Sequence, residues 1–84
     1  MAKRVIFSDE ARADIRAIHR ETALRLLETL ARFLETEAGD VKQPHGFDPP
    51  LYRLRIGDWR VIFRKSGADA INVVRVRNRR EANR

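Results

Sequence analysis

Residues 51–64 decide the fold, and they read Leu51-Tyr52-Arg53-Leu54-Arg55-Ile56-Gly57-Asp58-Trp59-Arg60-Val61-Ile62-Phe63-Arg64. Apolar and basic side chains alternate on both sides of Gly57-Asp58, which is a typical two-residue turn of a β-hairpin. With the turn there, Ile56 lies opposite Trp59, and the register continues along both strands. Side chains alternate between the two faces of a strand, so one face is apolar and is predicted to be the core. It carries Tyr52, Leu54, Ile56, Trp59, Val61 and Phe63.

The opposite face of the predicted hairpin, which we call the arginine face, carries Arg53, Arg55, Arg60 and Arg64. Arg55 and Arg60 lie directly opposite each other in this register, and like charges in such a pair destabilise a sheet. The two strands contain no acidic residue to relieve the repulsion, because Asp58 belongs to the turn. This pattern is typical of a binding site for an anionic partner, although arginines on a solvated sheet face are common without any partner.

The residues before the hairpin predict one short strand and two helices. Arg4–Phe7 is apolar enough for a strand, and Ser8 is a favourable N-cap for the helix that follows. Apolar residues then recur at spacings of three and four up to about Glu37. A single helix of that length would extend about 42 Å, which is too long for so small a domain. A break near residues 19–22 therefore predicts two antiparallel helices.

The remaining segments are a loop, a turn and a last strand. Gly39-Asp40 is expected to end the second helix, and residues 38–50 are predicted to form a loop. Residues 66–69 form a turn, and Ala70–Val76 is a strand. If Lys65 lies opposite Ala70, then Ile71, Val73 and Arg75 fall on the arginine face. The predicted fold class is α+β: one domain over residues 1–84, with two N-terminal helices packed on a mainly antiparallel, four-stranded twisted sheet.

The charge of the chain is concentrated in its second half. The 84 residues carry a net charge of +6, but residues 1–40 hold seven Lys or Arg and eight Asp or Glu. Residues 41–84 hold eleven basic and four acidic residues, and nine of the eleven are arginine. Arginine suits bidentate contacts with phosphate better than lysine does. The second half therefore predicts a contact with a polyanion such as nucleic acid.

Several classes of protein are disfavoured by composition. The chain has no cysteine, so disulfides, thiolate zinc sites and thiol nucleophiles are excluded. No paired carboxylates, metal-ligand cluster or glycine-rich phosphate loop is present, and His19 and His45 are interpreted as solvated residues. We expect no cofactor and no metal. No apolar run approaches the roughly 20 residues of a membrane span, so a cytoplasmic protein without membrane association is expected.

The hairpin resembles the central hairpin of the RelE/ParE superfamily of bacterial toxins, whose members often read Tyr-Arg-Leu-Arg-Val-Gly-Asp-Tyr-Arg-Val there. The opening strand, the helical pair and residues 76–84 also fit the layout of this family, so the resemblance covers nearly the whole chain. It implies a toxin of a type II toxin–antitoxin system, with a cognate antitoxin protein as partner. In the RelE branch, which the chain resembles most, it implies cleavage of mRNA in the ribosomal A site.

The resemblance also implies roles for individual residues. Arg53 and Arg55 match two basic residues on one strand, Arg60 an arginine on the next, and Arg79 an arginine after the last strand. Arg53 and Arg55 would orient the RNA backbone, Arg60 would stabilise charge on the scissile phosphate, and Arg79 would assist it or the leaving group. The 2′-hydroxyl of RNA would be the nucleophile. Further RNA contacts are expected from residues beside this set: Arg64, Arg75, Arg77, Arg80 and Asn83.

One departure from the family keeps other functions open. Asn83 stands where many RelE-like toxins have a tyrosine that stacks on or helps to activate the nucleotide, and asparagine can do neither. Tyr52 cannot replace that tyrosine if it faces the core. One alternative is therefore a ParE-like protein that inhibits DNA gyrase without cutting RNA. A second alternative is a module that binds its antitoxin and has no activity of its own.

Overall fold

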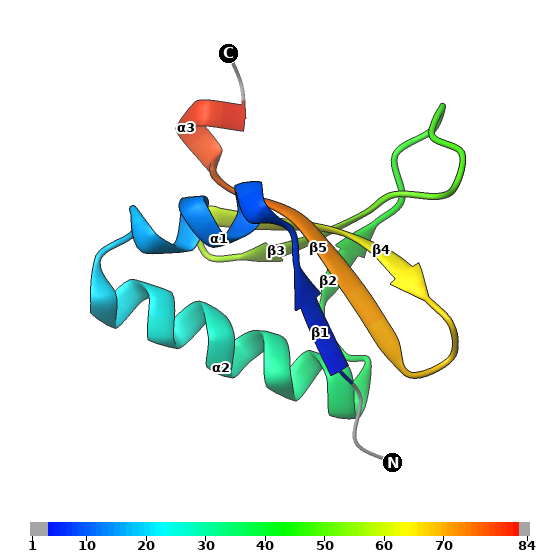
Figure 1. Cartoon of the computed structure of the whole chain (residues 1–84), viewed down its shortest axis with the longest axis horizontal. Coiled ribbons are helices and arrows are strands. Elements are labelled where there is room, and N and C mark those ends of the chain that lie inside the picture. Colours follow the sequence, from blue (N-terminus) through cyan, green and yellow to red (C-terminus); the bar gives the residue numbers. More distant parts are fainter. Residues whose placement is uncertain (1–3, 83–84) are drawn as a thin grey trace.

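The computed structural model describes residues 4–82. Its elements are β1 (Arg4–Phe7), α1 (Asp9–Arg16), α2 (Arg20–Thr36), β2 (Asp40–Lys42), β3 (Tyr52–Ile56), β4 (Trp59–Ser66), β5 (Ala70–Asn78) and α3 (Arg79–Ala82). The strands form one sheet in the order β1-β5-β4-β3-β2, in which only the β1–β5 pair is parallel. In Figure 1, α1 and α2 run antiparallel to each other beside the sheet. The predicted α+β class is confirmed, with one strand more than expected.

The start of α1 follows the predicted capping pattern. The Oγ atom of Ser8 accepts a hydrogen bond from the backbone N–H of Ala11 at 3.0 Å, and the first turn holds Asp9 and Glu10. Carboxylates in a first turn are favoured by the helix dipole. The predicted break between two helices is also found, although it lies at residues 17–19, slightly earlier than expected.

The end of α2 and the strand after it differ from the prediction. The helix ends at Thr36, and Glu37, rather than a glycine, takes the left-handed conformation with φ 57°. Gly39 has a different role, because a Cβ atom on it would lie 2.9 Å from Cδ1 of Leu54. This close approach lets the chain pair with β3 as the short strand β2, in a segment predicted to be a loop. Val41 packs against the core and holds β2 in place.

The register of the β3–β4 hairpin is the predicted one. Ile56 lies opposite Trp59, Arg55 opposite Arg60, and Tyr52 opposite Phe63. The apolar face is the core, which α1 and α2 cover with Ala11, Leu26, Leu30 and Leu34. Its most deeply buried large side chains are Leu54, Val61, Phe63 and Val73. Gly57 takes a φ of 59° at the first turn position, where a residue with a Cβ atom is disfavoured.

The register of β5 corrects the prediction for two residues. Ala70 lies opposite Ser66, not Lys65, so Ile71 and Val73 are buried on the core face rather than placed on the arginine face. The ladder then shifts by one residue, because Val73 pairs with Phe63 whereas Arg75 pairs with Ile62. Val74 is the extra residue of this β-bulge. The bulge returns Arg75 to the arginine face. The sequence predicted this position from a register in which Lys65 lies opposite Ala70, and that register is not the one found.

β5 is longer than predicted, and a short helix follows it. The strand continues to Asn78, two residues beyond the predicted end, and Arg79–Ala82 form the short helix α3. Within residues 4–82, no helix is long and apolar enough to cross a membrane.

Candidate nucleic-acid interface

Three arginines lie in one row across the middle of the sheet. Arg55 on β3 is paired with Arg60 on β4, and Arg60 is paired with Arg77 on β5. Side chains at directly opposed positions share a face and have Cβ atoms about 4.5–5.5 Å apart. The mutual repulsion of such a row favours binding of an anion between the guanidinium groups, which are strong phosphate donors.

Arg79 comes to the same place from a distant part of the sequence. Its backbone N–H donates a hydrogen bond to the backbone oxygen of Asp58 at 2.7 Å, which ties the start of α3 to the hairpin turn. As a result, Arg79 lines a hollow of about 360 Å³ together with Arg55 and Arg60. Arg80 lies beside it, and its backbone N–H donates to Oδ1 of Asn78 at 3.1 Å. Asn78, Arg79 and Arg80 line a neighbouring hollow.

A smaller hollow of about 50 Å³ is also lined by Arg55 and Arg60. Arg53 lines it, and so do Asp40 and Lys42 from β2. The register places Asp40 opposite Arg55 and Lys42 opposite Arg53, so both β2 residues lie on the arginine face. Asp40 thus brings onto the arginine face an acidic residue that the two hairpin strands themselves lack. A three-residue strand within a proline-containing loop carries too little periodicity to be found from sequence.

Arg64 extends the arginine face toward the far end of β4. It lies opposite Asn72 on β5. Its Nε atom is buried and has no hydrogen-bond acceptor within the part of the chain that the structure describes. A buried guanidinium N–H without an acceptor is costly, so an anionic ligand at this position would stabilise it.

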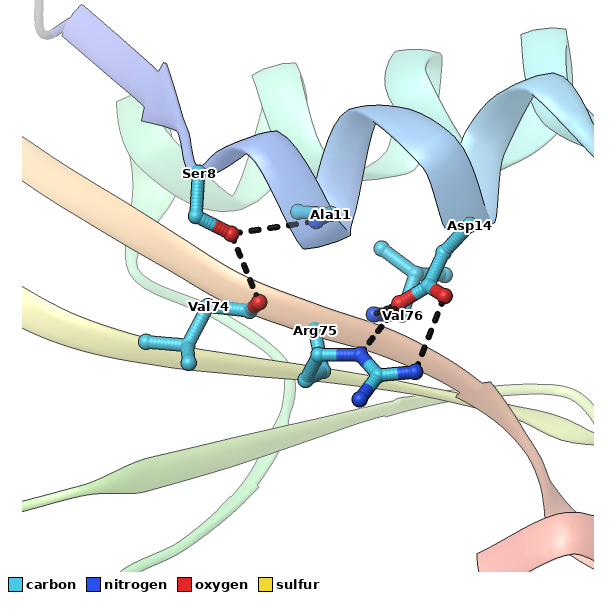
Figure 2. A network of polar contacts seen from close by, with 6 residues as sticks. All are labelled: Ser8, Ala11, Asp14, Val74, Arg75 and Val76. Atoms are coloured by element: carbon cyan, nitrogen blue, oxygen red, sulfur yellow. Dashed lines mark hydrogen bonds and ion pairs between the residues drawn. The ribbon is translucent and has the colours of Figure 1, made fainter.

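Arg75 is held by a carboxylate on α1, as Figure 2 shows. Its Nε and Nη2 atoms donate to the two oxygens of Asp14 at 2.8 and 3.1 Å, and the backbone N–H of Val76 donates to Oδ2 at 2.9 Å. At the bulge itself, Oγ of Ser8 donates to the backbone oxygen of Val74 at 2.8 Å. Beyond the end of β1, the N-cap residue Ser8 and Asp14 within α1 thus hydrogen-bond the backbone groups of Val74 and Val76 at the edge of β5.

The charge of Asp14 is stabilised by these contacts. Partial burial acts to raise the pKa of Asp14, but the hydrogen bonds from Arg75 and Val76 and the positive charges of Arg75 and Arg77 outweigh it. The pKa of Asp14 therefore lies below its ordinary value. Sequence reasoning missed this pair, because nothing in the spacing of residues 14 and 75 indicates that α1 reaches the bulge.

The other predicted positions fall outside this set of arginines. Tyr52 stacks on Phe63 with ring centroids 5.5 Å apart, so its ring belongs to the core side. His19 is the N-cap residue of α2, and His45 is exposed in the loop before β3. Asn83 lies outside the described residues. Within residues 4–82, no group of three or more histidine or acidic side chains is placed to hold a metal ion.

Comparison with protein families identifies the chain. Residues 5–83 match the family model of the ParE toxin of type II toxin–antitoxin systems. The chain belongs to this family. It is thus a type II toxin of the RelE/ParE superfamily. A comparison with curated protein sequences gave no significant match.

Solved structures of related toxins share the fold. The RelE–RelB complex of the archaeon Pyrococcus horikoshii is 26% identical, with a TM-score of 0.72 over 94% of this toxin and 97% of the matched chain. The RelBE2 complex of Mycobacterium tuberculosis is 20% identical, with a TM-score of 0.70 over 94% of this toxin and the whole matched chain (100%). The isolated RelE toxin of E. coli is 19% identical, with a TM-score of 0.71 over 92% of this toxin and 84% of the matched chain.

Proposed function

We propose that this toxin cleaves mRNA on the ribosome and that an antitoxin protein neutralises it. The observation that carries the proposal is the convergence of Arg55, Arg60 and Arg77 in one row, with Arg79 brought alongside by α3. A set of fixed guanidinium groups can hold an RNA backbone and stabilise the negative charge that develops on a phosphate under attack. The reaction needs no metal or cofactor if the 2′-hydroxyl is the nucleophile.

The residues divide into two groups in this proposal. Arg53 and Arg55 orient the backbone, Arg60 stabilises the scissile phosphate, and Arg79 assists the phosphate or the leaving 5′-oxygen. Arg64, Arg77 and Arg80 extend the contact along the RNA, and Asn83 would add a hydrogen bond. Arg75 has a smaller part in binding than the sequence suggested, because both of its donating atoms described above are directed to Asp14.

The antitoxin partner is supported by charge and by the related structures. The solved complexes from P. horikoshii and M. tuberculosis each contain a toxin with its antitoxin. Residues 41–84 of this toxin carry eleven basic and four acidic residues. An acidic segment that folds on binding would bury this charge and shield the arginine face. Co-expression with the adjacent reading frame should yield a complex that purifies together, and a toxin that remains alone would contradict this part of the proposal.

The deciding experiment is primer extension on mRNA in a purified translation system, with the toxin and with R60A. We expect cuts within codons that appear only on translating ribosomes. Removing a contact made in the transition state should lower the rate roughly 10²- to 10³-fold in R60A. Intact mRNA in the presence of folded toxin would refute the proposal, and so would undiminished cutting by folded R60A.

Inhibition of DNA gyrase is the second candidate, and the family match favours it, because the matching family is named for the ParE toxin. The arginine face would then contact a protein or DNA without a chemical step. A supercoiling assay with purified gyrase distinguishes gyrase inhibition from mRNA cleavage. Loss of supercoiling with intact ribosome-bound mRNA would establish the second function in place of the first. A purely antitoxin-binding module would be inert in both assays.

A further inference from the structure

Two acidic residues line two different hollows that share the central arginine pair. Asp40 on β2 lines the smaller hollow together with Arg55 and Arg60. Asp58, in the hairpin turn, lines the larger hollow with the same two arginines and with Arg79. A phosphate held by Arg55 and Arg60 would therefore adjoin both hollows, one lined by Asp40 and the other by Asp58 and Arg79.

Cleavage of RNA by its own 2′-hydroxyl requires a group that accepts the hydroxyl proton. The attacking and leaving oxygens lie in line on opposite sides of the phosphorus atom, so the proton acceptor and the leaving oxygen belong on opposite sides of the site. Arginine and a lysine ammonium are donors without an acceptor atom, so neither the arginines nor Lys42 suits this role. An ionised carboxylate is an acceptor only, and it suits the role in both charge and chemistry.

The position of Arg79 decides between the two carboxylates. Of the two roles that the proposed function gives to Arg79, we take assistance of the leaving 5′-oxygen, and Arg79 lies in the hollow that Asp58 also lines. The nucleophile then belongs away from Arg79, which favours the hollow that Asp40 lines and Arg79 does not. Asp40 is also held by the β2–β3 ladder directly opposite Arg55, whereas Asp58 is part of a turn.

Resting on the proposed ribonuclease function, we propose that Asp40 is the general base of this toxin. Its carboxylate takes the proton of the 2′-hydroxyl while the 2′-oxygen forms a bond to phosphorus. The bond from phosphorus to the 5′-oxygen breaks, and its electron pair leaves with the 5′-oxygen, which takes a proton from solvent water. Asp40 returns its proton to solvent. The products are a 2′,3′-cyclic phosphate and a 5′-hydroxyl end, and no water is consumed.

The test measures rate and affinity separately in D40N, which keeps the size of the side chain and removes its charge. The rate is single-turnover cleavage on translating ribosomes, and the affinity is measured with an mRNA carrying a 2′-deoxynucleotide at the cut site. We expect D40N to cleave roughly 10²-fold more slowly, the lower end of the range for general-base catalysis. We expect its affinity to increase, because a negative charge has left a face that binds an anion. D40E keeps a carboxylate and should recover part of the rate.

Two matched variants make the same charge change elsewhere. Asp69 lies in the turn between β4 and β5 and lines neither hollow. The D69N variant should therefore cleave at the wild-type rate. D58N changes the charge on the leaving-group side and should lose less rate than D40N. Circular dichroism and thermal melting confirm that each variant is folded.

The outcomes distinguish this inference from the proposed function. If D40N cleaves at the wild-type rate while R60A does not cleave, the inference is wrong and the ribonuclease function stands. If D40N loses affinity and rate together, Asp40 has a structural role and the inference is also wrong. A larger loss in D58N would assign the base to the other carboxylate. If the wild-type toxin leaves ribosomal mRNA intact, the proposed function and the inference fail together.

Discussion

The pair formed by Asp14 and Arg75 predicts how the stability of this toxin responds to mutation. Asp14 accepts three hydrogen bonds, two from the Arg75 guanidinium and one from the backbone N–H of Val76. Hydrogen bonds to a charged group contribute about 1.5–3 kcal/mol each when well buried. The side chain of Arg75 is 38% exposed and that of Asp14 is 16% exposed, so solvent screening reduces this contribution. We therefore expect D14A to lower the free energy of unfolding by about 2 kcal/mol in total.

Urea denaturation monitored by circular dichroism measures this change directly. For a domain of this size each 1 kcal/mol corresponds to a melting-temperature shift of about 4–8 °C, so D14A should melt about 8–16 °C below the wild type. D9N is a suitable control, because Asp9 is exposed in the first turn of the same helix. It should lose well under 1 kcal/mol, as expected for a helix-dipole interaction at the surface.

The same pair predicts a dependence on pH. The pKa of Asp14 is lower in the folded toxin than in the unfolded chain, so the unfolded chain binds the proton more tightly. The stabilisation by Asp14 is therefore complete above the unfolded pKa and is lost as the pH falls through the folded value. The stability difference between wild type and D14A should shrink as the solution is acidified. A D14A variant as stable as wild type at neutral pH, or a difference that persists in acid, would refute this reasoning.

Three further predictions concern the core, β2 and the arginine face. F63A should lower the free energy of unfolding by about 3–5 kcal/mol in urea titrations, because Phe63 is only 1% exposed; a loss below 1 kcal/mol would contradict its place in the core. G39A should cost about 1–3 kcal/mol in the same assay, since its Cβ atom would lie 2.9 Å from Leu54, and an unchanged midpoint would mean that β2 is not held against the core. R60A should reduce the salt dependence of binding to single-stranded RNA, with a log–log slope smaller by about 0.7; an unchanged slope would show that Arg60 contacts no phosphate.

The hairpin could be predicted from sequence because two local signals agree there. The two-residue turn fixes which residues face each other, and the strict alternation fixes which face is buried. The pairing of Arg55 with Arg60 and the burial of Phe63 follow from residues 51–64 alone. No long-range information is needed.

The parts that could not be predicted depend on contacts between distant residues. β2 is only three residues long and exists because Gly39 and Val41 fit against the core. The bulge at Val74 shifts the register of β5. It is held by a hydrogen bond from Ser8, the distant N-cap residue of α1, to the backbone oxygen of Val74. Arg79 could be assigned to the site only through the family resemblance, because α3 and its hydrogen bond to Asp58 leave no periodic signal in the sequence.

The position of β5 in the sheet has a consequence for how the toxin is made. Within residues 4–82, β5 is the last strand in sequence, yet it lies between β1 and β4, and its residues 70–73 pair with the four residues of β1. The complete sheet therefore cannot form until β5 has been synthesised, and pairings of such long sequence separation form late and slowly. Arg77, the end of the arginine row, is on that strand. The arginine row therefore cannot form on a nascent chain that still lacks β5.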